Sequence, residues 1–182
     1  MGQYYKPVNI DTMEFLESWD FSNGAKLMEH SYVGNDFVNA VELLLIEGGR
    51  WDGNRLVWAG DYADEVQEGK GNYYELSGRE SNEHNQLKAD GLIHACPDNY
   101  RYICNLDKNE YVDKNSMTPN AGGWQIHPLP LLTADGNGRG GGDYHGTDVR
   151  HVGSWKGDRL SIRTEVPTGF QEIKLQLREG VS

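Results

Sequence analysis

Two short sequence patterns each occur twice in this chain, so its fold must accommodate the same small structural unit at two positions. Residues 9–15 and 105–111 share Asn-x-Asp-x-x-Glu-aromatic, at an offset of 96 positions. Residues 51–56 and 155–160 share Trp-x-Gly-(Asn/Asp)-Arg-Leu, at an offset of 104 positions. A glycine-rich stretch, residues 135–143, lies in the second half only. Repetition is typical of a scaffold built from related units, and a loop found in one copy only is where we expect a site.

Hydrophobic periodicity and turn residues predict the secondary structure. β-Hairpins are predicted over residues 4–18 and 100–112, each around a polar turn. A helix is predicted over 36–47, because Asn35 can cap it and its apolar residues fall on one face. The other expected elements are a helix within 22–30, strands at 55–58 and 160–163, a short element at 72–76, and at most a turn or two of helix within 129–134.

We therefore expect an α+β fold in which two related hairpin–helix–strand units, an internal duplication, form one compact protein. The first unit would span residues 1–60 and the second residues 97–182. The acidic segment 61–96, which has little periodicity, would connect them. The sequence leaves open whether the two units share one sheet or pack two sheets together.

The chain is acidic, with a formal net charge of −11. Residues 1–96 contain 7 Lys and Arg against 17 Asp and Glu, and therefore carry nearly all of this charge. Polymeric nucleic acid is disfavoured as a partner, because phosphate binding needs a basic stripe. The acidic half is either a solvated face that favours solubility or a surface that docks on a basic protein partner.

Membrane and secretion signals are missing from the sequence. No apolar run approaches the ~20 residues that span a bilayer, and the N-terminus lacks the basic and apolar regions of a signal peptide. Cys96 and Cys104 give neither a metal-binding spacing nor a disulfide framework. We expect a cytoplasmic protein with free thiols and no membrane partner. Its oligomeric state, a homo-oligomer included, is left open.

The glycine-rich loop is the main candidate site, because its glycines allow positive φ and close approach to a ligand. In one interpretation its amides and arginines hold a phosphate, although no helix signal follows it and no Gly-Lys-Ser/Thr ends it. In the alternative, the loop is an ordered turn whose aspartates bond backbone amides. The candidate ligand-binding residues are Asp135, Asn137, Arg139, Gly140, Gly141, Asp143, Tyr144, Arg150, Trp155 and Arg159.

A metal site is a further alternative. His145, Asp148 and His151 follow the loop closely, and imidazole and carboxylate groups are suitable ligands for transition metals. Their spacing matches no recognised metal motif. An EF-hand is disfavoured because Gly146 occupies the position that requires a bidentate carboxylate.

Three stretches, residues 1–5 (MGQYY), 26–29 (KLME) and 131–143 (LLTADGNGRGGGD), resemble a group of uncharacterised proteins from bacteria and their phages. The group has no established activity, so the resemblance implies no catalytic residue and no cofactor. It implies a bacterial or viral intracellular setting, in which small compact proteins often act by binding.

The leading functional hypothesis is an intracellular protein that binds a small anionic ligand of nucleotide-like chemistry. In a phage this activity would sequester a host signalling nucleotide. The alternatives are a metal-assisted hydrolase or transferase that uses the 135–151 region, and an acidic protein-interaction or inhibitor module. The sequence does not decide whether the protein is an enzyme.

Overall fold

The computed structural model describes residues 2–92, 94 and 96–179. Six residues lie outside this description: Met1 of the expected first unit, Ile93 and Ala95 of the expected connecting segment, and residues 180–182 of the expected second unit.

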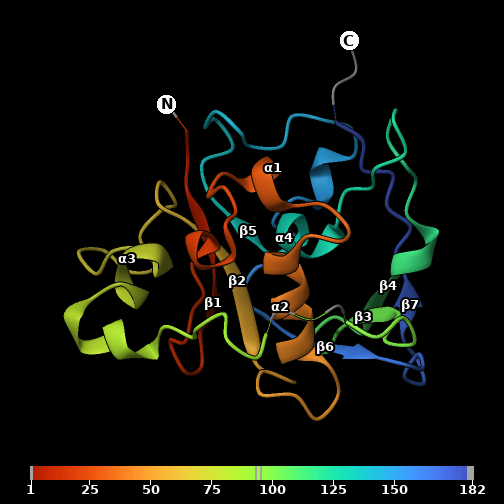
Figure 1. Cartoon of the computed structure of the whole chain (residues 1–182), viewed down its shortest axis with the longest axis horizontal. Coiled ribbons are helices and arrows are strands. Elements are labelled where there is room, and N and C mark those ends of the chain that lie inside the picture. Colours follow the sequence, from red (N-terminus) through yellow and green to blue (C-terminus); the bar gives the residue numbers. More distant parts are fainter. Residues whose placement is uncertain (1, 93, 95, 180–182) are drawn as a thin grey trace.

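One seven-stranded sheet runs through the molecule and joins the two halves of the sequence (Figure 1). Its strands are β1 (Tyr5–Asn9), β2 (Arg55–Gly60), β3 (Tyr102–Asn105), β4 (Glu110–Asp113), β5 (Ala134–Asp135), β6 (Asp158–Arg163) and β7 (Gln171–Glu172). Their order is β1–β2–β6–β3–β4–β7, and β5 pairs in parallel with β2. The halves meet where β2 and β6 pair antiparallel, with Arg55 opposite Arg159. The expected α+β class is confirmed, and the strands form a single sheet.

The helices are short and lie around this sheet. They are α1 (Leu27–His30), α2 (Asp36–Leu45), α3 (Tyr73–Ser77) and α4 (Pro128–Leu132), with 3₁₀ turns η1 (Ser18–Phe21), η2 (Glu80–Asn85), η3 (Lys114–Ser116) and η4 (Val149–His151). Within the described ranges, no helix has the length and apolar character needed to cross a membrane.

Helix α2 forms where the sequence predicts it. The side-chain oxygen of Asn35 accepts hydrogen bonds from the backbone N–H groups of Phe37 (2.9 Å) and Val38 (3.2 Å), which caps the first turn. The helix ends at Leu45, two residues before the predicted end. Gly48, with φ of +83°, then redirects the chain.

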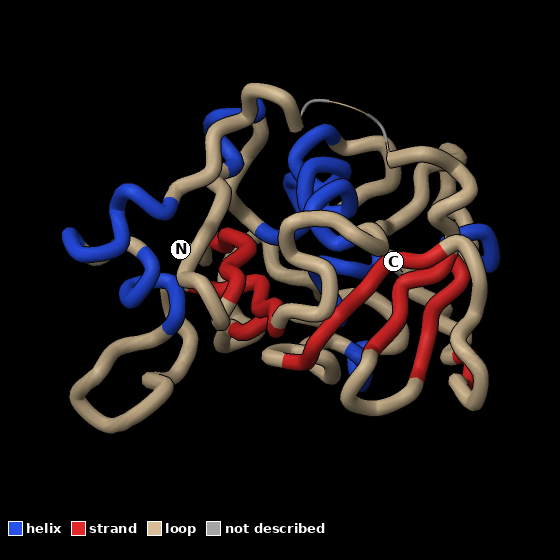
Figure 2. The backbone as a smooth tube through the Cα atoms, turned by 90° about the horizontal axis from the view of Figure 1, so that it is seen from below, coloured by secondary structure: helices blue, strands red, loops and turns tan. Residues whose placement is uncertain are grey.

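Apolar side chains pack on both faces of the sheet, because neighbouring residues of β2 point to opposite sides. Trp58 belongs to the larger core, with residues of α2 and α4. Val57 belongs to a smaller cluster, against which Tyr74 of α3 packs. In Figures 1 and 2 the segment with α3 and η2 lies at one side of the molecule, beyond β1. The short element predicted at 72–76 is confirmed, and through it the 61–96 segment contributes to the packing.

The hairpin predicted over residues 4–18 is wrong, because β1 does not take the chain after its turn as its partner strand. β1 pairs along its whole length with β2, and the chain after the turn returns only as a single bridge between Val8 and Phe15. Met13, with φ of +58°, ends the turn, and the backbone N–H of Asn9 then donates to the carbonyl of Glu14 at 2.8 Å. The hairpin predicted over 100–112 is confirmed as the antiparallel pair β3–β4.

The helix predicted within 22–30 forms only as α1. The backbone carbonyl of Ala25 accepts a hydrogen bond from the Tyr5 N–H at 2.8 Å, and Lys26 is extended. The residues before Leu27 therefore pair with the start of β1 instead of entering a helix.

Asn9 and Asn105 close the two matched turns in the same way. Each side-chain oxygen accepts hydrogen bonds from the backbone N–H groups two and three residues further on, at 2.9–3.3 Å. Each side-chain amide donates to the residue before the matched arginine, which is Asn54 (3.1 Å) or Asp158 (2.8 Å). The repeated asparagine thus acts as a turn residue.

Asp11 and Asp107 tie each turn to a strand. Asp11 accepts hydrogen bonds from the backbone N–H and the Nε of Arg55, both at 2.8 Å. Asp107 accepts the same two bonds from Arg159, at 2.7 and 2.8 Å. The two carboxylates are also similarly exposed, at 32% and 35%.

The matched tryptophans complete the correspondence. The indole N–H of Trp51 donates to Glu14 at 2.9 Å, and that of Trp155 donates to Glu110 at 3.2 Å. Both indoles are buried. The repeated Trp-x-Gly-(Asn/Asp)-Arg-Leu therefore has a structural role in both places.

Equal surroundings predict equal energetic roles for the two carboxylates. Asp11→Ala and Asp107→Ala should each lower the free energy of unfolding by about 1–2 kcal/mol, because each removes two charge-assisted hydrogen bonds at a partly exposed site. Urea denaturation of the two variants, beside the exposed control Asp64→Ala, measures this. A difference between the two variants greater than about 1 kcal/mol would contradict the equivalence.

The same prediction has a defined dependence on pH. Hydrogen bonds from Arg159 lower the pKa of Asp107. Burial would raise the pKa of Asp11, but the bonds from Arg55 outweigh it and the pKa is lowered. The stabilisation is therefore present above the ordinary aspartate pKa and is lost as pH falls through the native value. The two variants should differ from the parent at neutral pH and approach it in acid.

Candidate functional site

The glycine-rich loop is folded around the side chain of Gln3, which is fully buried. The Gln3 amide nitrogen donates to Asn137 Oδ1 (3.0 Å) and to Asp143 Oδ2 (2.9 Å), and its oxygen accepts from the Asn137 N–H (3.2 Å). Gly2 forms a parallel bridge with Gly141. The N-terminal segment therefore forms one wall of the loop.

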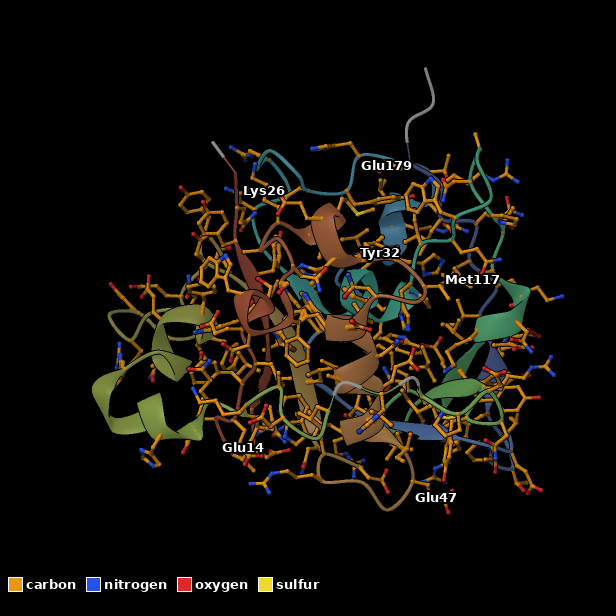
Figure 3. All side chains as sticks on the ribbon, in the orientation of Figure 1. Glu14, Lys26, Tyr32, Glu47, Met117 and Glu179 are labelled. Carbon is orange, nitrogen blue, oxygen red and sulfur yellow. The ribbon has the colours of Figure 1, made fainter. Side chains whose placement is uncertain are left out.

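The loop glycines allow this close approach. A Cβ added at Gly140 would lie 2.5 Å from Gln3 Cβ and 2.8 Å from Gln3 N. One added at Gly142 would lie 2.6 Å from Lys26 Cβ. Figure 3 places Lys26 at the upper end of the molecule, close to the N-terminal segment. Part of the glycine content thus has a packing reason.

A cavity of about 580 Å³ opens beside the loop. Its size is in the range of pockets that hold small molecules. Its residues come from the start of β1, from α1, from β5 and the loop after it, and from the chain leading into β6. Apolar lining comes from Leu27, Ala134, Val149 and Val152, and polar lining from Tyr5, Asn137, Asp143, Tyr144, His145 and Lys156.

Asp143 is the most unusual group in this lining, because the residue is only 3% exposed and its two geometric hydrogen bonds are both to one carboxylate oxygen. Oδ2 accepts from the Gln3 amide (2.9 Å) and from the Gly140 N–H (2.8 Å). Oδ1 is buried, and within the described ranges it has no hydrogen-bond partner. Leaving a buried acceptor unpaired costs roughly 1–3 kcal/mol, and the neighbouring Tyr5 hydroxyl is the group of the chain that can offset this cost.

The hydroxyl of Tyr5 is the neighbouring polar group. Burial, the negative charge of Asp143 and a hydrogen bond that the phenol donates to this carboxylate raise the pKa of Tyr5, in that order of effect, so the phenol stays protonated at neutral pH. A side chain at Gly136 would lie 2.3 Å from this hydroxyl, so the missing side chain leaves room for the ring. Tyr5 and Asp143 thus form a buried polar pair at one side of the cavity.

Basic side chains also line the cavity or follow its lining residues in the chain. Lys156 lines the cavity, is 57% exposed and forms an ion pair with Asp135 at 3.4 Å. His145 is also part of the lining. Arg139 and Arg150 are exposed, and each follows a lining residue in the chain. Arg150 pairs with Asp148 at 3.2 Å.

Seven of the ten sequence-derived ligand candidates lie outside the lining of this cavity. Trp155 is fully buried with its N–H on Glu110, so it has no free ring face for a base. Arg159 is held by Asp107 in the second matched turn. Gly140 and Gly141 shape the loop without lining the cavity. Of the ten candidates, Asn137, Asp143 and Tyr144 form the lining directly.

The three candidate metal ligands are not brought together. His145 lines the cavity, whereas Asp148 Oδ1 lies 3.7 Å from His151 Nε2 and its Oδ2 accepts from the Gln176 N–H at 3.0 Å. In the part of the chain that the structure describes, no group of three or more His, Cys, Asp or Glu could hold a metal ion.

A second cavity, of about 380 Å³, contains a buried charged cluster. Glu42 bonds Lys114 at 2.8 Å and His127, whose Nδ1 accepts from the Leu129 N–H. Burial would raise the pKa of Glu42, but His127 and Lys114 outweigh it and hold the pKa at about 2. Burial raises the pKa of Cys96 to about 12, which keeps this thiol protonated. The carboxylate and both imidazole nitrogens are thus already paired.

Tyr5, Leu27 and Lys156 are lining residues that the sequence does not single out. Lys156 occupies the variable position of a repeated motif, and Tyr5 sits in a strand pattern, so neither spacing indicates a site. The N-terminal MGQYY motif contains Gln3 and Tyr5, and this is the one sequence signal that includes them.

The packing of the loop on Gln3 predicts unequal costs for two alanine substitutions. Gly140→Ala should destabilise the protein by about 2–3 kcal/mol through overlap with Gln3. Gly138→Ala, where φ is +69° and nothing lies within 4 Å of the added Cβ, should cost about 1 kcal/mol of backbone strain. Urea midpoints compare the two. If Gly140→Ala is no more destabilising than its control, the close packing is wrong.

Comparison of the chain with protein-family models, with curated proteins and with solved structures found no match.

Proposed function

We propose that the protein binds a small, anionic, nucleotide-like ligand in the cavity beside the glycine-rich loop. The observation that carries the proposal is a cavity of about 580 Å³ whose lining combines apolar side chains with the ammonium group of Lys156. Apolar side chains suit a flat heterocycle, and the Lys156 ammonium group suits a phosphate. The resemblance to bacterial and phage proteins favours an intracellular signalling nucleotide as the ligand.

Lys156 allows a test of how the protein would bind the anionic end of the ligand. Isothermal titration calorimetry with a panel of linear and cyclic mono- and dinucleotides should find a ligand that binds at micromolar or lower concentration. Lys156→Ala should weaken that ligand tenfold or more, because it removes the lining ammonium group. The exposed control Lys88→Ala should bind like the parent. Absence of heat across the panel at several hundred micromolar would refute the proposal.

A second candidate function is docking on a basic protein partner, and an exposed aromatic pair favours it. Trp19 is 59% exposed and Tyr4 is 42% exposed, and their rings meet edge to face at 6.2 Å between centroids. Asp61 accepts a hydrogen bond from the Tyr4 N–H at 3.0 Å, which brings the segment 61–68, with four acidic and no basic residues, beside the pair. Arginine side chains stack on such rings and pair with such carboxylates.

An oligo-arginine peptide tests this candidate. Trp19→Ala should weaken peptide binding about tenfold in fluorescence anisotropy, whereas Trp124→Ala, at a site 40% exposed, should not. Glu68→Gln with Asp64→Asn should weaken binding more than the charge-matched pair Glu47→Gln with Asp36→Asn. If the two double variants weaken binding equally, the peptide responds only to the net charge of the protein.

We also infer that the two matched units arose by internal duplication of one unit in which a strand, a turn, a helix and a second strand follow one another, with segment 61–96 between the copies. The equal hydrogen bonds of Asp11 with Arg55 and of Asp107 with Arg159 support this inference. The short α4 and the glycine-rich loop are then features of the second copy, and the cavity uses a part of the molecule that the first copy lacks.

A further inference from the structure

A groove of about 500 Å³ adjoins the cavity of the proposed ligand site, because Val149 belongs to the lining of both. The other residues of the groove are Thr147, Asp148, Arg150, Lys174 and Gln176. Val149 is apolar and 57% exposed, and it is the residue at which the two spaces meet. A ligand that is bound in the cavity and is long enough to pass over Val149 would therefore enter the groove.

The groove has the excess of positive charge. Its charged residues are one carboxylate, Asp148, and two cations, Arg150 and Lys174, so its lining sums to +1. In the cavity lining, one ammonium group, Lys156, is balanced by one carboxylate, Asp143. With histidine neutral, the cavity lining has no net charge. The groove is therefore the more favourable place for additional anionic charge.

The cations of the groove have donors that the fold does not use. Lys174 is exposed, and within the described ranges it forms no ion pair. Arg150 is 80% exposed and pairs with Asp148 through Nε at 3.2 Å. The Lys174 ammonium group and the terminal N–H groups of Arg150 can therefore donate to phosphate oxygens.

The groove is ordered by the chain itself, because segments 147–150 and 174–178 are bonded to one another. The Gln176 N–H donates to Asp148 Oδ2 at 3.0 Å, and the Thr147 hydroxyl donates to the Gln176 carbonyl oxygen. The two basic side chains thus come from segments whose backbones are tied together. Binding of an anion between them needs little reordering of the backbone, which lowers its entropic cost.

We infer that the ligand is elongated, with its heterocycle and first phosphate in the cavity and a second phosphate in the groove at Arg150 and Lys174. This inference rests on the proposed binding function and deepens it by naming the class of nucleotide. The class comprises nucleotides with a second phosphate group, either further along a polyphosphate chain or in a dinucleotide. A nucleoside monophosphate would occupy the cavity and leave the groove empty.

Isothermal titration calorimetry tests this inference with matched short and long ligands of each of the four RNA bases. The ligands are the 5′-monophosphate, the 5′-triphosphate and the linear dinucleotide with a 5′-phosphate, all without divalent cations. The parent protein should bind a triphosphate or a dinucleotide at least tenfold more tightly than the monophosphate of the same base. The comparison of the two long ligands identifies the source of the second phosphate.

Lys174→Ala separates the groove from the cavity. It removes an ammonium group of the groove only, so it should weaken the long ligand about tenfold and change the affinity for the monophosphate less than twofold. Lys156→Ala should weaken both ligands, because the first phosphate is common to them. The exposed control Lys88→Ala should change neither affinity, which separates a local contact from an effect of net charge.

The outcomes separate the two levels of the proposal. Equal affinity for short and long ligands would overturn the inference and keep the binding function. The same holds if Lys174→Ala weakens the monophosphate as much as the long ligand, or if Lys88→Ala weakens the long ligand as much as Lys174→Ala does. Absence of binding by every ligand would refute the proposed function itself, and the inference with it.

Discussion

The antiparallel pairing of β2 with β6 is the contact on which the rest of the structure depends. It joins strands from the two halves of the sequence, with Arg55 opposite Arg159. Each arginine is held by an aspartate of the matched turn in its own half. The like charges that face one another across the pair are thereby neutralised, which removes the repulsion that would otherwise destabilise it. The turns therefore make the central pairing possible, and the central pairing places β1 and β3 on either side of it.

A second constraint couples the N-terminus to the candidate site. Gln3 contributes three hydrogen bonds to a loop that lies 134 to 140 positions away in the sequence. Its burial orders the loop and fixes one oxygen of Asp143. The glycines of the loop serve this packing first, because side chains at Gly140 and Gly142 would overlap Gln3 and Lys26. Alanine replacement of the loop would consequently disturb folding and binding together, so it cannot distinguish a ligand site from a structural turn.

The two cavities differ in how their buried carboxylates are satisfied. Glu42 has a partner on each oxygen, and its pKa is held at about 2 by His127 and Lys114, against the effect of burial. It thus connects α2 to η3 and to the start of α4 within the fold. Asp143 has both of its donors on one oxygen and none on the other within the described ranges. Paired buried charges are expected in any stable core, and the Tyr5 hydroxyl is the further polar neighbour of the Asp143 carboxylate.

Local chemistry determined what the sequence alone could predict. The Asn35 cap of α2, the β3–β4 hairpin, strand β2 and the two Asn-x-Asp turns depend on residues only a few positions apart, so their patterns are readable without a structure. The glycine-rich loop stands out in the sequence for the same reason. Only the tertiary structure decided that β1 pairs with β2, that Trp155 and Arg159 belong to the scaffold, and that Tyr5, Asp143 and Lys156 line one cavity. These contacts join residues up to about 150 positions apart, and their choice depends on which backbone groups and side chains are left to be satisfied once the sheet has formed.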